Sequence, residues 1–192
     1  MGHEPSSILK PWENFYVIIG SSAAALTGLV FVVITIVSGS DRVRRSREGT
    51  RTFTTPTVVH FGAALLASAS LSIPWPSLFY VSIVFALLGL FGVGYVLRVA
   101  YRIRRMTTYD ADTEDWIWHT LMPLLAYGAI LAGAVALPAL AAEAMFAFAF
   151  AVIVLTFTGV HNAWDIVTFI AVENSDPAPT ETPADDEKKA DA

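Results

Sequence analysis

Long apolar stretches separated by short polar ones dominate the pattern of this sequence. Five of them stand at about residues 15–38, 56–73, 78–98, 117–138 and 145–171. Each is close to the length of about 20 residues that an α-helix needs to cross a hydrocarbon core. The pattern therefore predicts an all-α membrane protein in which residues 15–172 form five transmembrane helices.

Prolines mark the places where these helices are expected to end. The segment "PWPS" (Pro74–Ser77) predicts a tight hairpin, because two prolines cannot continue a helix. The segment "PALAAEA" (138–144) separates the last two stretches in the same way. In "TTPT" we expect Thr55 to cap the second helix and Pro56 to lie in its first turn.

The two ends of the chain differ from the apolar part. Residues 1–14 are short and polar, and we expect them to form an external N-terminal segment. Residues 173–192 are acidic and contain no aromatic or large aliphatic side chain. Such a segment buries too little apolar surface to offset its ordering entropy, so a disordered cytoplasmic tail is predicted.

Composition agrees with a membrane location. Of the 192 residues 55% are hydrophobic and 15% are charged, whereas soluble domains average about 25% charged residues. There is no cysteine, which excludes disulfides, thiolate metal sites and thiol catalysis.

The distribution of basic residues predicts the orientation. With five spans, eleven of the twelve lysines and arginines fall on one side and only Lys10 falls on the other. The positive-inside rule makes the basic side cytoplasmic. We therefore expect the N-terminus outside, the C-terminus inside, and a location in the inner (plasma) membrane.

Small residues recur at helical spacing in several spans. Because lipid tails are as apolar as leucine, such positions mark faces where helices approach closely. They either hold the five helices together or form a subunit interface, and both alternatives stay open. The predicted helix-packing residues are Gly20, Ala24, Gly28, Gly89, Gly92 and Gly133.

A polar group interrupts the last apolar stretch, in "GVHNAWDIV" (159–167). His161 and Asp165 are four residues apart and thus neighbours on one helix face. We expect them to form one coupled unit facing the bundle interior, with Asn162 completing its hydrogen bonds. The alternative is a capped, partly hydrated helix end, which the interfacial residue Trp164 favours.

The predicted topology brings further histidines to the same side. His60 and His119 lie near the cytoplasmic starts of the second and fourth spans. Together with His161 and Asp165 they would suit a transition metal, haem or a proton relay. No metal-binding motif such as H-E-x-x-H is present, so the metal assignment stays open.

A basic face leaves the membrane after the third span. Arg98, Arg102 and Arg105 share one side of the expected helix. They either contact anionic lipid headgroups or serve only to set the topology.

Four stretches resemble a group of uncharacterised small prokaryotic multi-pass integral membrane proteins. They are "FYVIIGSSAAALTGLVFVV", "RTFTTPTVVHF", "DWIWHTLMPLLAY" and "GVHNAWDIVTF". The resemblance covers most of the membrane part and implies a membrane protein, with no activity, cofactor or substrate attached to it.

These patterns predict a non-enzymatic membrane scaffold or regulatory subunit. It would have no cofactor, would contact the lipid bilayer, and would pair with itself or with a membrane-protein partner, but not with nucleic acid. The first alternative is an oligomeric ion- or proton-coupled channel or small transporter that uses the His/Asn/Asp cluster. The second is a membrane metal- or haem-binding protein.

Overall fold

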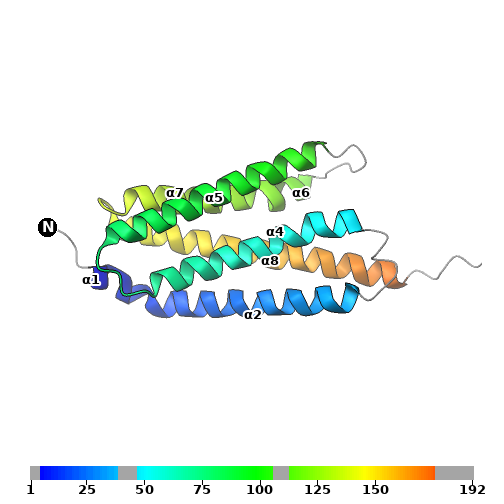
Figure 1. The fold of residues 1–192 in the computed structure, drawn as a ribbon, viewed down its shortest axis with the longest axis horizontal. Helices are drawn as coiled ribbons and strands as arrows, with labels where there is room; N and C mark the ends of the chain where they lie inside the picture. The colour runs from blue at the N-terminus through cyan, green and yellow to red at the C-terminus, as the bar shows by residue number, and fades with distance from the viewer. Residues whose placement is uncertain (1–4, 39–46, 106–112, 176–192) are drawn as a thin grey trace, which may run out of the picture.

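The structure, a computed structural model, describes residues 5–38, 47–105 and 113–175, and these residues form an elongated helical bundle (Figure 1). The elements in chain order are α1 (Pro5–Leu9), η1 (Lys10–Trp12), α2 (Glu13–Ser38), α4 (Arg47–Leu71), α5 (Leu78–Arg105), α6 (Thr113–Trp116), η2 (Ile117–Leu121), α7 (Met122–Ala136) and α8 (Ala141–Ser175). The described residues contain no strand. The all-α fold is thus confirmed, while the predicted tail from residue 176 onward lies outside the described residues.

Five helical rods run along the bundle, the fourth of them made of α6, η2 and α7 in succession. Four rods contain segments long and apolar enough to cross a membrane, namely Pro5–Thr35, Leu78–Arg105, Ile117–Ala136 and Ala141–Thr168. The fifth, α4, has only a shorter apolar part, Thr55–Leu71. Several of its hydroxyl and imidazole groups are buried inside the bundle, namely those of Thr57, His60, Ser68 and Ser70.

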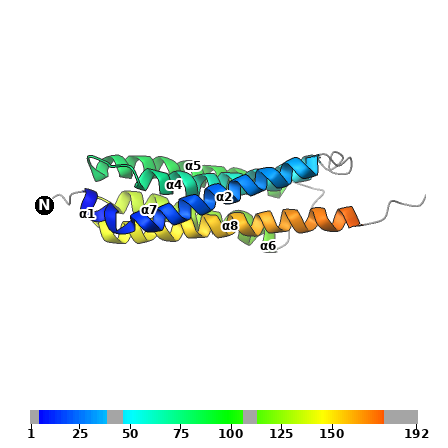
Figure 2. The same cartoon turned by 90° about the horizontal axis from the view of Figure 1, so that it is seen from below.

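The rods do not pack in simple chain order. Helix α5 packs mainly on α7, α7 on α8, α8 on α4, and α4 on α2 (Figures 1 and 2). The chain runs in the same direction along α2 and α8, and in the opposite direction along α4. The last helix therefore lies in the middle of the bundle, between α7 and α4, where its polar residues meet those of other helices.

Helix α4 begins earlier than predicted. The expected capping role of Thr55 is wrong, because α4 starts at Arg47 and carries Pro56 inside it. A proline within a helix removes one hydrogen bond but does not always end the helix, since packing on neighbouring helices holds the remaining turns together.

The hairpin predicted at Pro74–Ser77 is confirmed. The indole Nε1 of Trp75 donates a hydrogen bond of 2.7 Å to the carbonyl of Ser70. The hydroxyl of Ser77 accepts one of 3.2 Å from the backbone N–H of Phe79, in the first turn of α5. The hairpin thus satisfies backbone groups at the end of one helix and at the start of the next.

The N-terminal segment is more structured than its polarity suggested. Residues 5–12 are helical, and Leu9 is buried. The Trp12 ring meets the Phe146 ring edge-on at 4.8 Å, and the hydroxyl of Tyr16 donates to the carbonyl of Met145 at 3.3 Å. The apolar side chains of residues 8–12 decide this outcome by packing on the start of α8.

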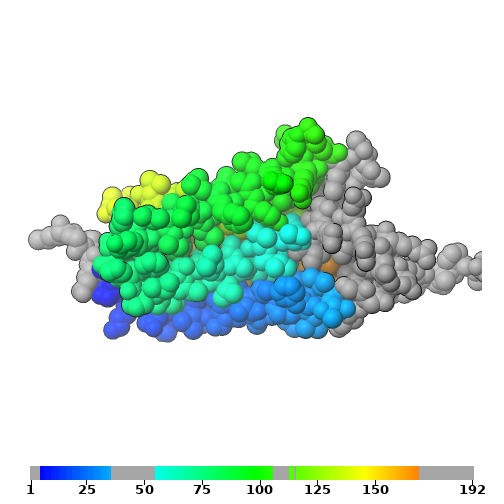
Figure 3. Space-filling model, in the orientation of Figure 1, coloured from blue at the N-terminus to red at the C-terminus, as the bar shows by residue number. Residues whose placement is uncertain are grey.

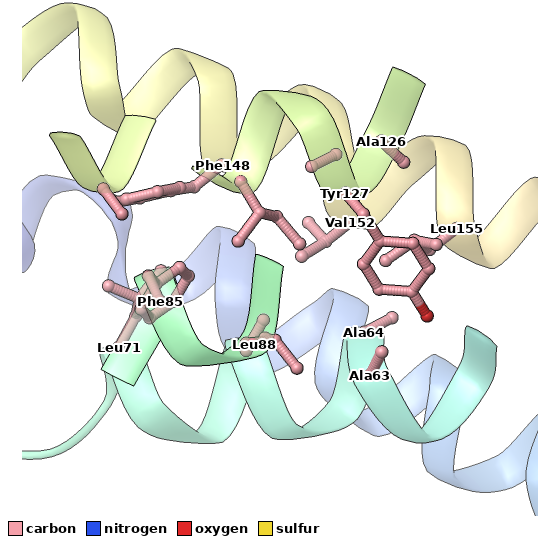
Figure 4. Close-up of a cluster of buried hydrophobic side chains, with 14 of the residues drawn as sticks. Ala63, Ala64, Leu71, Phe85, Leu88, Ala126, Tyr127, Phe148, Val152 and Leu155 are labelled. Carbon is pink, nitrogen blue, oxygen red and sulfur yellow. The ribbon is translucent and has the colours of Figure 1, made fainter. Parts of the chain in front are cut away.

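Aromatic rings and small residues build the core together (Figure 4). The rings of Phe85 and Phe148 lie 4.3 Å apart between α5 and α8. A Cβ at Gly89 would lie 2.9 Å from the backbone of Leu131, and one at Gly133 would lie 2.7 Å from the ring of Phe148. These two predicted packing positions therefore bring helices into close contact.

The predicted stripe on α2 divides into two parts. Gly20 is buried, and a Cβ there would lie 3.0 Å from that of Ser68. Ala24 and Gly28 are exposed, and nothing lies within 4 Å of a Cβ at Gly28. The expectation that Gly28 packs inside the bundle is therefore wrong, and the subunit-interface alternative for this end of the stripe stays a prediction.

The outer surface is rich in large apolar side chains. Exposed leucine, isoleucine, valine and phenylalanine residues occur on α2, α5 and α8, and one face of the bundle is formed by α2, α4 and α5 side by side (Figure 3). Soluble monomers rarely expose apolar patches of more than a few hundred Å². A surface of this kind is compatible with a hydrocarbon environment.

Candidate functional site

Pro123 shapes the helix that carries His119. Proline lacks an N–H, and its ring clashes with the carbonyl four residues earlier, which here belongs to His119. The chain widens in front of it into the π-helical segment η2, closed by a bond from the N–H of Met122 to the carbonyl of Ile117. Such π-bulges are common at functional sites. This one places His119 in the interior, where only 6% of it is exposed.

His60 lies at the centre of the buried polar group. It is 1% exposed, and its Nδ1 is 3.2 Å from the hydroxyl of Tyr127, which reaches from α7 toward α4 (Figure 4). The Tyr95 ring of α5 meets the imidazole edge-on at 6.4 Å. His119 is close enough to interact with it electrostatically. Three other helical elements thus surround one side chain of α4.

Helix geometry places Asn162 in the same interior space. Gly159 of α8 faces Phe61 of α4, and His161 faces Trp118 of η2. At 3.6 residues per turn, Asn162 lies on the arc between these two directions, about 60° from Gly159. It therefore faces the wedge between α4 and η2, the elements that carry His60 and His119.

Several polar atoms in this region have no hydrogen-bond partner among the described residues. They are Nε2 of His60, both amide atoms of Asn162, and Oγ1 of Thr158, one turn from Asn162 on the same face. Leaving a buried polar group unpaired costs about 1–3 kcal/mol. A cluster of such groups is kept at a cost to stability, which is typical of functional positions.

We define the interior site as His60, His119, Tyr127, Thr158 and Asn162. Among the residues whose burial the structure describes, no aspartate or glutamate is buried. The side chains that form the interior site are themselves neutral donors and acceptors. An isolated charge in such surroundings would be strongly disfavoured. The arrangement therefore suits a neutral hydrogen-bonding ligand better than a stored charge.

A second group, the edge site, lies at the bundle surface beside the interior site. His161 Nε2 is 3.2 Å from Asp165 Oδ2 and 3.7 Å from Glu114 Oε1, and the His161 ring stacks on Trp118 at 3.9 Å. The predicted His161–Asp165 pair is present. The carboxylates are 50% and 70% exposed, so the edge site faces outward and not into the bundle.

This exposure corrects two expectations about the pair. Asp165 is half exposed, and Asn162 does not complete its hydrogen bonds, because both amide atoms are buried without a partner among the described residues. Exposed ion pairs typically contribute about 0.2–1 kcal/mol. The pair is thus a minor source of stability. The alternative of a capped helix end at this position is wrong, because α8 continues from Asp165 to Ser175.

The four predicted polar residues do not meet at one point. His60 and His119 belong to the interior site, whereas His161 and Asp165 belong to the edge site. Within the described ranges, no three His, Asp or Glu side chains are placed to hold one metal ion. The positions of these residues therefore do not support the alternative of a metal centre.

The predicted basic face lies at the exposed end of α5. Arg98, Arg102 and Arg105 are all exposed. Arg105 lies over the Tyr101 ring at 4.6 Å, and the neighbouring Arg104 lies over the Trp116 ring at 5.3 Å. Cation–π contacts of this kind leave the guanidinium accessible, and contact with anionic lipid stays a prediction.

Tyr127, Trp118 and Glu114 belong to the two sites but were not predicted. Tyr127 looks in the sequence like an ordinary member of an apolar span. Trp118 and Glu114 precede Pro123. A proline at this position favours a π-bulge, which rotates the preceding side chains around the helix axis relative to those of α7. This proline is the signal in the sequence that could have indicated their direction.

No protein-family model, curated protein or solved structure matches this chain.

Proposed function

We propose that the chain is a multi-pass integral membrane protein whose five rods all cross the bilayer. Four rods contain apolar segments of spanning length, and the exposed surface carries large apolar side chains. Helix α4 is shorter in its apolar part, but it packs on α2 and α8, which shield its polar residues from lipid. This location accounts for the apolar exterior and the polar interior together.

The expected orientation has the N-terminus outside and the C-terminus inside, with the arginine-bearing end of the bundle in the cytoplasm. A reporter enzyme fused after Ala192 should be active only in the cytoplasm, and one fused before Met1 only outside. The measurement is the activity of paired cytoplasmic and external reporters in cells. Both ends on one side would contradict the five-span arrangement.

For the activity, we propose a non-enzymatic regulatory or scaffold subunit. The observation that carries this proposal is the one-sided position of the interior polar groups. At 1.5 Å per residue, His60, His119 and Asn162 lie within about 10 Å of the same end of their apolar segments. Beyond them the ring pair of Phe85 and Phe148 closes the core. A buried polar site that lies near one end of the bundle suits binding and regulation better than passage across the membrane.

A second candidate, a proton-coupled transporter or channel, is favoured by one observation. Nε2 of His60 and the Asn162 amide are buried and have no partner among the described residues. Ionisable residues inside a membrane are functional candidates by default. A transporter would need these groups to become accessible from both sides in turn.

One experiment separates the two candidates. The purified full chain is reconstituted into liposomes that contain a pH-sensitive dye, and a proton gradient is imposed by acidifying the outside, with equal potassium and valinomycin on both sides to hold the membrane potential at zero. We expect the gradient to decay no faster than in empty liposomes. Decay that is faster with the wild-type chain, and that returns to the background rate with His60→Gln, would establish transport and overturn the regulatory proposal.

A second measurement, the size of the assembly in detergent, tests whether the chain binds a partner. Gly28 is exposed and surrounded by open space, so Gly28→Leu should leave the isolated fold intact. In mild detergent, the wild type should elute as a stoichiometric assembly with itself or with another membrane protein, and Gly28→Leu should weaken it. An assembly of unchanged size would show that this face of α2 contacts only lipid.

A further inference from the structure

Helix α5 lies at the surface of the bundle (Figure 3), and one side of it is apolar along most of its length. Exposed large apolar side chains recur there at steps of three and four residues, which keep them on one side of the helix. They include Phe79, Ile83, Leu87, Leu90, Phe91 and Leu97. From Phe79 to Leu97 the helix rises about 27 Å at 1.5 Å per residue, close to the thickness of about 30 Å of a hydrocarbon core. This side of α5 thus presents apolar surface over the depth of one bilayer.

Three arginines continue the same side of α5 beyond the apolar part. Arg98 follows Phe91 by seven residues, Arg102 and Arg105 follow at steps of four and three, and all three arginines are exposed. A helical side chain points back toward the N-terminus of its helix, which for α5 is the apolar end. Arg102 accordingly lies close enough to Tyr95 to interact with it electrostatically. The arginines therefore point toward the boundary between the apolar and the basic part.

Gly94 leaves an open space on this side of α5, one turn before Arg98. It is exposed, and nothing lies within 4 Å of a Cβ at this position. We call this space the Gly94 gap. Its neighbours on the helix surface are the residues three and four positions away, namely Leu90, Phe91, Leu97 and Arg98. Three apolar side chains and one arginine thus border the gap, as suits the place where the acyl chains of a lipid join its headgroup.

The charge of these arginines is not offset within the described part of the bundle. There the carboxylates of Glu114 and Asp165 interact with His161, and none forms an ion pair with Arg98 or Arg102. Guanidinium groups bind phosphate through paired, charge-assisted hydrogen bonds. The basic end of this surface is therefore complementary to a phosphate group.

The same features argue against a second copy of the chain as the occupant. Copies inserted in one orientation meet through the same surface at the same depth, so their arginines would face each other and repel. Helices that pack closely in lipid also use small residues at the contact, whereas Leu87, Leu90 and Phe91 are large. Both the charge and the size of the side chains on this surface therefore favour a lipid.

We propose that this side of α5 binds an anionic phospholipid from the leaflet at the arginine-bearing end. One acyl chain lies along Leu90 and Phe91, the glycerol region occupies the Gly94 gap, and the phosphate lies between Arg98 and Arg102. The proposal rests on the membrane embedding proposed above and not on the regulatory role. The topology reporters test the embedding independently, so a failure of lipid binding is distinguishable from a failure of the embedding.

The headgroup contact is tested by native mass spectrometry of the purified full chain, titrated in detergent with phosphatidylglycerol or with phosphatidylcholine of the same acyl chains. Each basic residue near an anionic headgroup strengthens binding about fivefold, so the wild type should retain phosphatidylglycerol roughly tenfold more than phosphatidylcholine. The double variant Arg98→Gln/Arg102→Gln should lose this preference. The control Lys10→Gln/Arg104→Gln removes the same charge at exposed positions away from the Gly94 gap, and it should keep the preference.

The Gly94 gap is tested with a second matched pair. Gly94→Leu should lower retention of both lipids at least about fourfold, which is the effect of losing contact with one buried methylene group. Gly28→Leu, which also fills open space at an exposed position, should retain as much lipid per chain as the wild type. If Gly94→Leu lowers the melting temperature, Leu90→Trp replaces it, because the larger ring covers the gap from an exposed position.

The proposal requires both results. An unchanged preference in Arg98→Gln/Arg102→Gln would overturn it, and so would equal retention in Gly94→Leu and Gly28→Leu. A smaller assembly of Gly94→Leu with unchanged retained lipid would also overturn it, because a second copy would then cover this side of α5.

Discussion

Replacing Gly92 by alanine should destabilise the protein strongly. A Cβ at this position would overlap the ring of Tyr127, which is fully buried. The ring has no room to retreat without losing its hydroxyl contact to His60. Overpacking of a well-packed core typically costs about 1–3 kcal/mol, occasionally more, and we expect Gly92→Ala to lie at the upper end of this range.

The measurement is the free energy of unfolding in a membrane mimetic, compared with a control two residues away. Nothing lies within 4 Å of a Cβ at Gly94, so Gly94→Ala should be neutral, or stabilising by up to about 1 kcal/mol through better helix propensity. Equal effects of the two substitutions would contradict the close packing of α5 on α7. They would also remove the support that Gly92 gives to the interior site.

The substitution Asn162→Leu should stabilise the protein. The asparagine is 1% exposed, and neither amide atom has a partner among the described residues. Replacing an unpaired buried amide by an apolar side chain of similar volume removes a penalty of about 1–3 kcal/mol. For a chain of this size we expect the melting temperature to rise by about 2–12 °C.

Two further variants define what this result means. Asn162→Asp introduces a charge into a region without a buried counter-charge and should destabilise the protein markedly. Asn14→Leu, at an exposed position, should have little effect. If Asn162→Leu instead lowers the melting temperature, the amide is paired in the working protein, and the interior site is a satisfied structural network.

The helical architecture followed from the sequence because long apolar runs leave the backbone few alternatives in lipid. The Pro74–Ser77 hairpin was equally predictable, since two prolines stop a helix regardless of its neighbours. The start of α4 was not, because a proline inside a helix removes one hydrogen bond without always ending the helix. The helical structure of residues 5–12 was not predicted, since only the start of α8 shows what Leu9 and Trp12 contact.

The candidate site was predicted in composition but not in arrangement. The spacing of four residues was enough to pair His161 with Asp165. It was not enough to show which side of α8 faces the interior, because that depends on where Phe61 and Trp118 stand. The separation of His60 and His119 from this pair follows from contacts between distant parts of the chain, which one sequence does not display.

If the chain spans a bilayer as we propose, the short apolar part of α4 has a consequence for how the chain is inserted. A segment limited to Thr55–Leu71, and carrying buried hydroxyl and imidazole groups, gains little when it partitions into lipid by itself. The strongly apolar helix α5 follows α4 directly in the chain, after the tight Pro74–Ser77 connection. Insertion of α4 and α5 together as one hairpin would let α5 supply the driving force for partitioning into the bilayer. The polar side of α4 would then be covered only when α8, which is synthesised last, packs on it.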